Sequence, residues 1–127
     1  MNPGPEPFLA NAIAALEDAR LLVDYGRWSG AVARSYYAML HAAQALLDAG
    51  EMLPREDAVV HAAFAQELAQ SGVVDPSHHQ ALVDAFERRL LADFGPEGVL
   101  REAEAVDAVR RAADLVHAAR RAAQQQA

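Results

Sequence analysis

Proton-transferring and cationic side chains gather on one side of a predicted helix in the segment 28–50. At steps of three and four residues, this helix presents a single ridge made of Arg34, Tyr37, His41, Gln44 and Asp48. Histidine can exchange a proton near neutral pH, and an arginine guanidinium is shaped to bind phosphate. The ridge could therefore support a hydrogen-bonded site completed by another helix. The alternative is a solvated helix face without chemistry.

A second group of charges lies on the predicted helix over 77–94. The buried side of this helix is expected to consist of Leu82, Phe86 and Leu90. Arg89 and Asp93 lie at the margin of that side, four residues apart, and an ion pair between them would offset the cost of burying either charge. Alternatively, Arg89 points into a crevice between helices or subunits and binds a phosphate, with Arg88 free to add charge. Both interpretations make this helix end the second candidate site.

The remaining reactive side chains exclude several other chemistries. The chain has no cysteine, and its histidines, at positions 41, 61, 78, 79 and 117, form no H-x-x-x-H pair. It also has no glycine-rich phosphate loop and no G-x-S-x-G elbow. We therefore expect no metal site and no cofactor. His61 lies beside the apolar face of a predicted helix and is interpreted as a hydrogen-bonded residue at the edge of the core, with ligand binding as the alternative.

Composition indicates one soluble helical domain. The chain of 127 residues is 53% apolar, contains 30 alanines and no lysine, and so favours helix. Its formal net charge of −7 argues against a protein that coats nucleic acid or an anionic membrane through bulk electrostatics. The first residues lack the basic and apolar regions of a signal peptide, and no apolar run is long enough to span a bilayer. We expect a cytoplasmic protein without membrane contact.

The candidate side chains must be positioned by helices, which the apolar pattern predicts at about 6–25, 29–50, 55–70, 77–94 and 97–123. The core stripe of the second is predicted to contain Trp28, Val32, Ser35, Tyr36, Met39, Leu40, Ala43, Leu46 and Leu47. That of the last is predicted to contain Val99, Val106, Val109, Ala112, Ala113, Val116 and Ala119. Alanine stripes suit a close-packed core or, equally, a subunit interface.

Short connections make consecutive helices antiparallel neighbours. The sequence therefore predicts an all-α fold, an up-and-down helical bundle of four main helices plus one shorter helix. We expect a single domain over residues 1–127, with residues 1–5 and 124–127 frayed.

One stretch resembles a known family. The segment 21–50 reads LLVDYGRWSGAVARSYYAMLHAAQALLDAG and is similar to the second-helix region of small bacterial and archaeal HEPN domain proteins. The shared pattern is A-x-x-x-S-Y-Y-A-x-x-H-A-A-x-A-L-L followed by glycine, and it begins here at Ala31. The later segment R-L-L-A-D-F, from Arg89 to Phe94, resembles the family's R-x-x-A-D-Y element with phenylalanine in place of tyrosine.

The resemblance implies a small helical homodimer, often encoded beside a minimal nucleotidyltransferase as a toxin and antitoxin pair. Many such proteins are metal-independent ribonucleases that use an R-x(4-6)-H motif in a cleft across the dimer. In this chain the corresponding positions after Arg88 or Arg89 hold Asp93, Phe94, Gly95 or Pro96, so the family's histidine is missing. The spacing Arg34-x6-His41 fits the formula but lies on another helix. Phe94 also lacks the hydroxyl that some partner enzymes nucleotidylate.

Two functional hypotheses follow. The first is a HEPN module that binds a nucleotidyltransferase antitoxin, and a nucleotide or RNA in the dimer cleft through Arg34, Tyr37, His41 and Arg88. The second is a metal-independent endoribonuclease toxin whose catalytic residues are Arg89 and Asp93, aided by Arg34 and His41. An arginine beside Asp93 would lower the pKa of that carboxyl and weaken it as a base. A third hypothesis, a bundle used only for assembly, remains if neither nucleotide nor partner binds.

Overall fold

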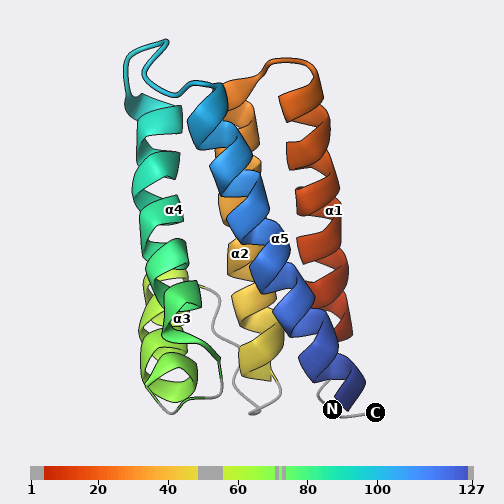
Figure 1. Ribbon diagram of the computed structural model, residues 1–127. Helices are drawn as coiled ribbons and strands as arrows, with labels where there is room; N and C mark the ends of the chain where they lie inside the picture. Colours follow the sequence, from red (N-terminus) through yellow and green to blue (C-terminus); the bar gives the residue numbers. More distant parts are fainter. Residues whose placement is uncertain (1–4, 49–55, 71, 73, 126–127) are drawn as a thin grey trace.

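Helix α2 (Trp28–Asp48) runs through the centre of the molecule, and three long helices pack around it (Figure 1). These are α1 (Glu6–Asp24), α4 (Pro76–Phe94) and α5 (Glu102–Gln125). The computed structural model describes residues 5–48, 56–70, 72 and 74–125. Consecutive long helices run in opposite directions, which confirms the predicted all-α up-and-down bundle. In the described part of the chain, no helix is long and apolar enough to cross a membrane.

The central place of α2 follows from its sequence. Every residue of the predicted core stripe is buried except Trp28, which is half-buried. The other sides of the helix carry alanines, which are buried as well because their small side chains let neighbouring helices approach closely: Ala31, Ala38, Ala42 and Ala45. The polar ridge is consequently not a solvated face. Gln44 is only 7% exposed, and Arg34, Tyr37 and His41 are half-buried.

A short helical segment lies at the lower left of the bundle in Figure 1. It consists of α3 (Asp57–Ala63) and the π-helix η1 (Phe64–Ala69), which packs with α3 against α2 and α4. The Gln70 N–H donates to the Ala65 carbonyl at 3.0 Å, a five-residue step in place of the usual four. The predicted helix over 55–70 is therefore present through Ala69, with its second half wound as a π-helix. Its predicted first residue, and the predicted end of the preceding helix at Gly50, lie outside the described residues.

Helix α4 begins where the sequence predicts. The Asp75 side chain accepts a hydrogen bond from the Ser77 N–H at 2.9 Å, and Pro76 occupies the first turn, where its missing N–H costs nothing. Leu82 is fully buried, whereas Leu90 is 39% exposed, so its predicted place in the core is wrong. Leu90 lies on the outer side of α4 because Arg89, its neighbour in the chain, is turned toward α2.

Helix α5 begins later than predicted. Residues 95–101 form a turn in which Gly98 has φ +86°, a conformation that glycine adopts without strain, and the buried Leu100 anchors this turn to the core. The buried side of α5 consists of Ala105, Ala108, Ala112, Leu115, Val116 and Ala119. Val106 is 49% exposed, so the predicted stripe was partly misplaced. The helix continues through Gln125, beyond the predicted onset of fraying, and residues 126–127 lie outside the described residues.

Candidate functional site

The Arg89 guanidinium lies between α4 and α2, among three aromatic rings. Its Nη1 donates a hydrogen bond to the Tyr37 hydroxyl at 2.9 Å. Its central carbon lies 5.3 Å from the Tyr36 ring centroid, 5.8 Å from that of Tyr37 and 5.5 Å from that of Phe86. At these distances the three rings make cation–π contacts with Arg89. Such contacts are stronger when the cation is shielded from water. The side chain as a whole is 19% exposed, although its Nε is buried.

Arg89 is weakly paired with a carboxylate. The Nε of Arg89 lies 4.0 Å from Asp93 Oδ2, beyond hydrogen-bond distance, and this buried Nε has no hydrogen-bond partner in the described part of the chain. The hydrogen bond to Tyr37 raises the pKa of the Arg89 guanidinium further above its already high value, although burial opposes this. Within the described residues, this cation at the α2–α4 contact therefore has only a long ion pair to Asp93.

A second set of polar contacts surrounds the hydroxyl of Tyr36, a residue that is fully buried. This hydroxyl donates to Asp57 Oδ2 at 2.9 Å and lies 3.0 Å from Nε2 of His61. Burial, followed by the hydrogen bond and negative charge of Asp57, holds the pKa of Tyr36 well above its ordinary value. The hydroxyl therefore stays protonated and joins α2 to α3.

The contacts of Tyr36 also define the tautomer of His61. A phenol has one proton, and here it goes to Asp57, so the contact with His61 requires Nε2–H to donate. The other ring nitrogen, Nδ1, then carries a lone pair and has no hydrogen-bond partner among the described residues. Burial lowers the pKa of His61 below its ordinary value, although the Asp57 charge opposes this, so the imidazole is neutral at neutral pH.

The two sets of contacts meet at one aromatic ring. The His61 imidazole packs edge-to-face against Phe86, with ring centroids 5.3 Å apart and an interplanar angle of 82°. Arg89 lies against the same Phe86 ring and against the Tyr36 ring. A neutral histidine from α3 and a cation from α4 are thus held on a shared aromatic support.

Comparison with known proteins identifies the fold family. The HEPN domain model matches residues 6–122, which is nearly the whole chain. The chain belongs to the HEPN family. It is 34% identical over 95 residues to a UPF0332 protein of Gloeobacter violaceus, covering 75% of each chain. It is 33% identical over 97 residues to a UPF0332 protein of Thermotoga maritima, covering 76% of this chain and 74% of that one.

A third relative carries a functional name. The chain is 28% identical over 106 residues to a Methanocaldococcus jannaschii protein named "Putative toxin MJ0605", covering 76% of this chain and 79% of that one. The matches to all three relatives cover about three quarters of each chain.

Three of the predicted site residues of this HEPN domain lie together. Tyr37 contacts Arg89, and the Arg34 guanidinium lies 5.5 Å from the Tyr37 ring centroid. Arg34 also approaches Asp18 of α1 at 3.7 Å, with both side chains substantially exposed. His41 lies one turn further along α2, where its Nδ1–H donates to the Gln44 side-chain oxygen at 3.0 Å. Asp93 remains at the edge of the group, 4.0 Å from Arg89.

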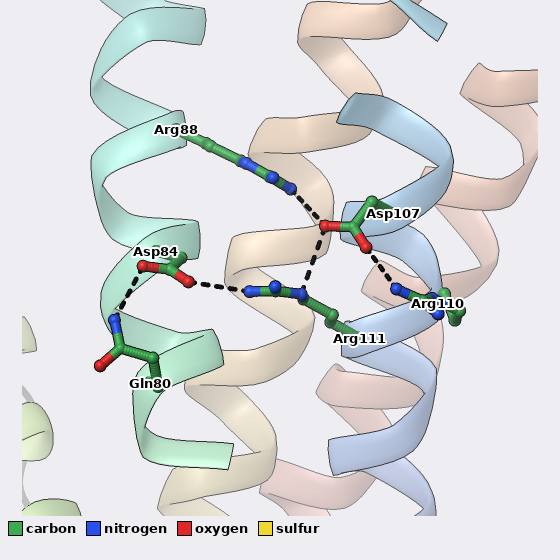
Figure 2. A network of polar contacts seen from close by, with 6 residues as sticks. All are labelled: Gln80, Asp84, Arg88, Asp107, Arg110 and Arg111. Carbon is green, nitrogen blue, oxygen red and sulfur yellow. Dashed lines mark hydrogen bonds and ion pairs between the residues drawn. The ribbon is translucent and has the colours of Figure 1, made fainter. Parts of the chain in front are cut away.

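Arg88 is directed elsewhere. Figure 2 shows its guanidinium reaching from α4 to Asp107 on α5, where Nη1 donates at 2.9 Å. Asp107 also forms an ion pair with Arg111, whose Nε lies 3.2 Å from Asp107 Oδ2. Arg111 Nη1 in turn donates to Asp84 of α4 at 2.9 Å. The expectation that Arg88 is free to add charge beside Arg89 is therefore wrong. Its charge is neutralised by Asp107, in a group of ion pairs that joins α4 to α5.

The polar contacts of Tyr36 were not predicted from the sequence. The apolar pattern assigned Tyr36 to the core, where a buried phenol needs a hydrogen-bond partner. Asp57 and His61 are four residues apart, so they share one face of the predicted third helix, and this spacing was the available signal. The interpretation of His61 as a hydrogen-bonded residue at the edge of the core agrees with its contact to Tyr36. Its unpartnered Nδ1 was not foreseen.

Proposed function

We propose that this HEPN protein is the toxin-type member of a toxin–antitoxin-like pair and that it binds phosphates of RNA or a nucleotide at Arg89. The observation that carries the proposal is the state of that arginine, whose side chain is 19% exposed, donates to the Tyr37 hydroxyl and lies 4.0 Å from Asp93, beyond hydrogen-bond distance. Arg88 and Arg111, by contrast, each donate to a carboxylate at 2.9 Å. A phosphate at Arg89 would supply the missing counter-charge.

The overall charge of the protein supports a local site. A net charge of −7 disfavours general attraction to a polyanion, so binding must depend on a few placed cations. Arg34 is a second cation at the same tyrosine, since it lies over the Tyr37 ring whose hydroxyl binds Arg89. We assign the first phosphate to Arg89 and an adjacent phosphate to Arg34, with Tyr37 between them. His41 extends the same ridge by one turn.

A homodimer is part of this proposal. The outer side of α4 beside the site exposes three large apolar side chains: Leu90 at 39%, Leu91 at 44% and Phe94 at 81%. Exposed apolar side chains that cluster next to a functional group are typical of protein contact surfaces. A second copy docked on this face would place two Arg89 sites near one cleft. The antitoxin would be a minimal nucleotidyltransferase, bound by contact, since Phe94 offers no hydroxyl for modification.

An endoribonuclease toxin is the second candidate function. It is favoured by the neutral His61 held on the same Phe86 ring as Arg89, because metal-free RNA cleavage needs a proton acceptor and a cation near the phosphate. The sequence-based choice of proton acceptor, Asp93, remains a proposal alongside this one. Its side chain is 39% exposed.

RNA binding tests the proposal directly. Fluorescence anisotropy with a labelled 2′-O-methyl RNA oligonucleotide, in EDTA, measures affinity without cleavage. We expect Arg89→Ala to weaken binding about 10-fold or more, as for the loss of a charge-assisted contact. Arg88→Ala is the matched control, because it removes the same charge from the adjacent position, where it is already neutralised by Asp107. Equal affinities for native protein and Arg89→Ala would refute the site.

A further inference from the structure

Two connections at one end of the bundle border a cavity of about 510 Å³. They are the turn between α1 and α2 and the connection between α4 and α5, which lie together at the top of Figure 1. The apolar wall of the cavity consists of Leu22, Trp28 and Leu100. The remaining lining residues are Gly26, Arg27, Ser29, Gly30, Glu97 and Gly98. This volume is typical of sites that bind small molecules or single groups of larger ones.

The missing side chain of Gly30 keeps the cavity open on the α2 side. A Cβ built at Gly30 would lie 3.4 Å from Leu22 Cδ1, so a larger side chain would fill the space between α1 and α2. Gly98, in the other connection, has φ +86°, and a Cβ there would meet no atom within 4 Å. The cavity therefore has room for a flat group beside the indole of Trp28.

Three polar or aromatic groups of the cavity have no side-chain partner among the described residues. Arg27 and Glu97 form no ion pair there, and the half-buried Trp28 indole makes no hydrogen bond or ring contact. One cation, one carboxylate and one aromatic face are thus available to a ligand at the same place.

We propose that this cavity binds a guanine base of the RNA held at Arg89, and that Glu97 is the residue that selects guanine. The inference rests on the proposed RNA-binding function and adds a base preference to it. The Trp28 indole would stack on the base, an interaction that every base can make. Arg27 would bind the phosphate of the same nucleotide.

The carboxylate of Glu97 gives the selectivity. The Watson–Crick edge of guanine presents two adjacent donors, N1–H and the 2-amino group, which match the two oxygens of a carboxylate. Adenine presents one donor beside an acceptor nitrogen, and uracil presents one donor between two carbonyl oxygens. Either of these bases would leave an acceptor facing the negative charge of Glu97.

The cavity and the proposed phosphate site follow one side of α2. Gly30 is four residues before Arg34, and Arg34 is three residues before Tyr37, so the three positions form one row. Arg34 lies over the Tyr37 ring, whose hydroxyl accepts a hydrogen bond from Arg89. Along the helix axis, Gly30 and Arg34 are about 6 Å apart. A strand with phosphates at Arg89 and Arg34 would therefore continue toward the cavity.

The test separates the base from the phosphates. Purified full-length protein in EDTA is titrated with 2′-O-methyl oligouridine and with the same strand carrying one central guanosine, adenosine or inosine. We expect the guanosine strand to bind about 10-fold more tightly than the uridine and adenosine strands, as for a bidentate base contact. Inosine, which lacks the 2-amino group, should lose most of this advantage.

The fluorescence of Trp28 reports on the cavity alone, because the chain contains one tryptophan. The guanosine strand should quench this fluorescence more strongly than oligouridine does, since the base stacks on the indole. Glu97→Gln should abolish the preference for guanosine over adenosine and keep the affinity for oligouridine. Glu102→Gln is the matched control, because it makes the same charge change at an exposed position outside the cavity lining, and it should behave like native protein.

Each outcome decides the assignment. A guanosine preference that is accompanied by quenching and lost in Glu97→Gln supports it. If oligouridine binds and the four strands have equal affinities, the guanine site is overturned and the binding function at Arg89 stands. A guanosine preference that Glu97→Gln retains, or that leaves Trp28 fluorescence unchanged, also overturns the guanine site. Native protein that binds none of the strands overturns both the binding function and this inference.

Discussion

The hydrogen bond from Arg89 Nη1 to the Tyr37 hydroxyl, 2.9 Å long, joins α4 to the central helix α2. It brings together two residues that are 52 positions apart in the chain and turns the polar ridge of α2 toward a cation. The first prediction concerns this bond. Tyr37→Phe should lower the free energy of unfolding by about 1–2 kcal/mol, because it removes an acceptor from a partly buried charged donor. Chemical denaturation measures the change.

The control for that variant is Tyr25→Phe. Tyr25 is 76% exposed, so loss of its hydroxyl should change the free energy of unfolding by less than about 0.5 kcal/mol. If both variants unfold at the same denaturant concentration as native protein, the Arg89–Tyr37 bond contributes nothing to stability.

A second prediction concerns the contact between α2 and α3. Tyr36→Phe keeps the ring in its buried position but leaves Asp57 and His61 without their shared partner. We expect a loss of about 1–3 kcal/mol in the free energy of unfolding, since groups desolvated in the native state lose their hydrogen bonds. Hydrogen exchange should locate the weakening in α3. If the amides of α3 exchange at the same rates in Tyr36→Phe as in native protein, the prediction is contradicted.

A third prediction concerns acid stability. The hydrogen bonds from Arg111 and Gln80 lower the pKa of Asp84. Burial raises the pKa of Asp107, but hydrogen bonds from Arg110 and Arg88 outweigh it, so this pKa is also lowered. Carboxyls with a depressed folded-state pKa stabilise the protein above the ordinary aspartate value of about 4, and this stabilisation is lost as pH falls below it. Urea midpoints should therefore decrease steeply below about pH 4.

Asp84→Asn tests the source of that dependence. The amide keeps a hydrogen-bonding oxygen toward Arg111 but does not titrate, so its urea midpoint should fall less between neutral pH and pH 3 than that of native protein. A variant with the same pH dependence as native protein would show that Asp84 does not contribute to acid unfolding.

A fourth prediction concerns the proposed homodimer. Phe94→Glu places a charge in the middle of the exposed apolar side of α4 and should convert the dimer to monomer at micromolar concentration. Sedimentation velocity measures this directly. Val106→Glu, at a position 49% exposed on α5, is the matched control and should remain dimeric. A native protein that sediments as a monomer would rule out the dimer itself.

The fold could be predicted from sequence wherever a residue pattern has a single structural interpretation. The apolar stripe of α2 marked its core positions correctly, and Asp75-Pro76-Ser77 marked the start of α4. The predicted start of the last helix at Glu97 is wrong, because Gly98 adopts φ +86° and the helix begins only at Glu102. The π-helix η1 has no recognised sequence signal and was missed.

The site could be predicted only in part, because side-chain partners depend on how each helix is rotated about its axis. Arg88 and Arg89 are adjacent and chemically identical, yet one faces α5 and the other α2. Nothing in the residue pattern pairs Asp107 with Arg88 or Tyr37 with Arg89. The mutual placement of Asp57, His61 and Tyr36 likewise required the packing of α3 against α2.

The most direct measurement of the central proposal is the NMR signal of the Arg89 Nε–Hε group during titration with 2′-O-methyl RNA. A spectrum of Arg89→Lys assigns this signal by its disappearance. The Arg89 signal should shift on binding, because a phosphate would contact the guanidinium, while the signal of Arg88, held by Asp107, should remain in place. RNA that binds without moving the Arg89 signal would contradict the proposal.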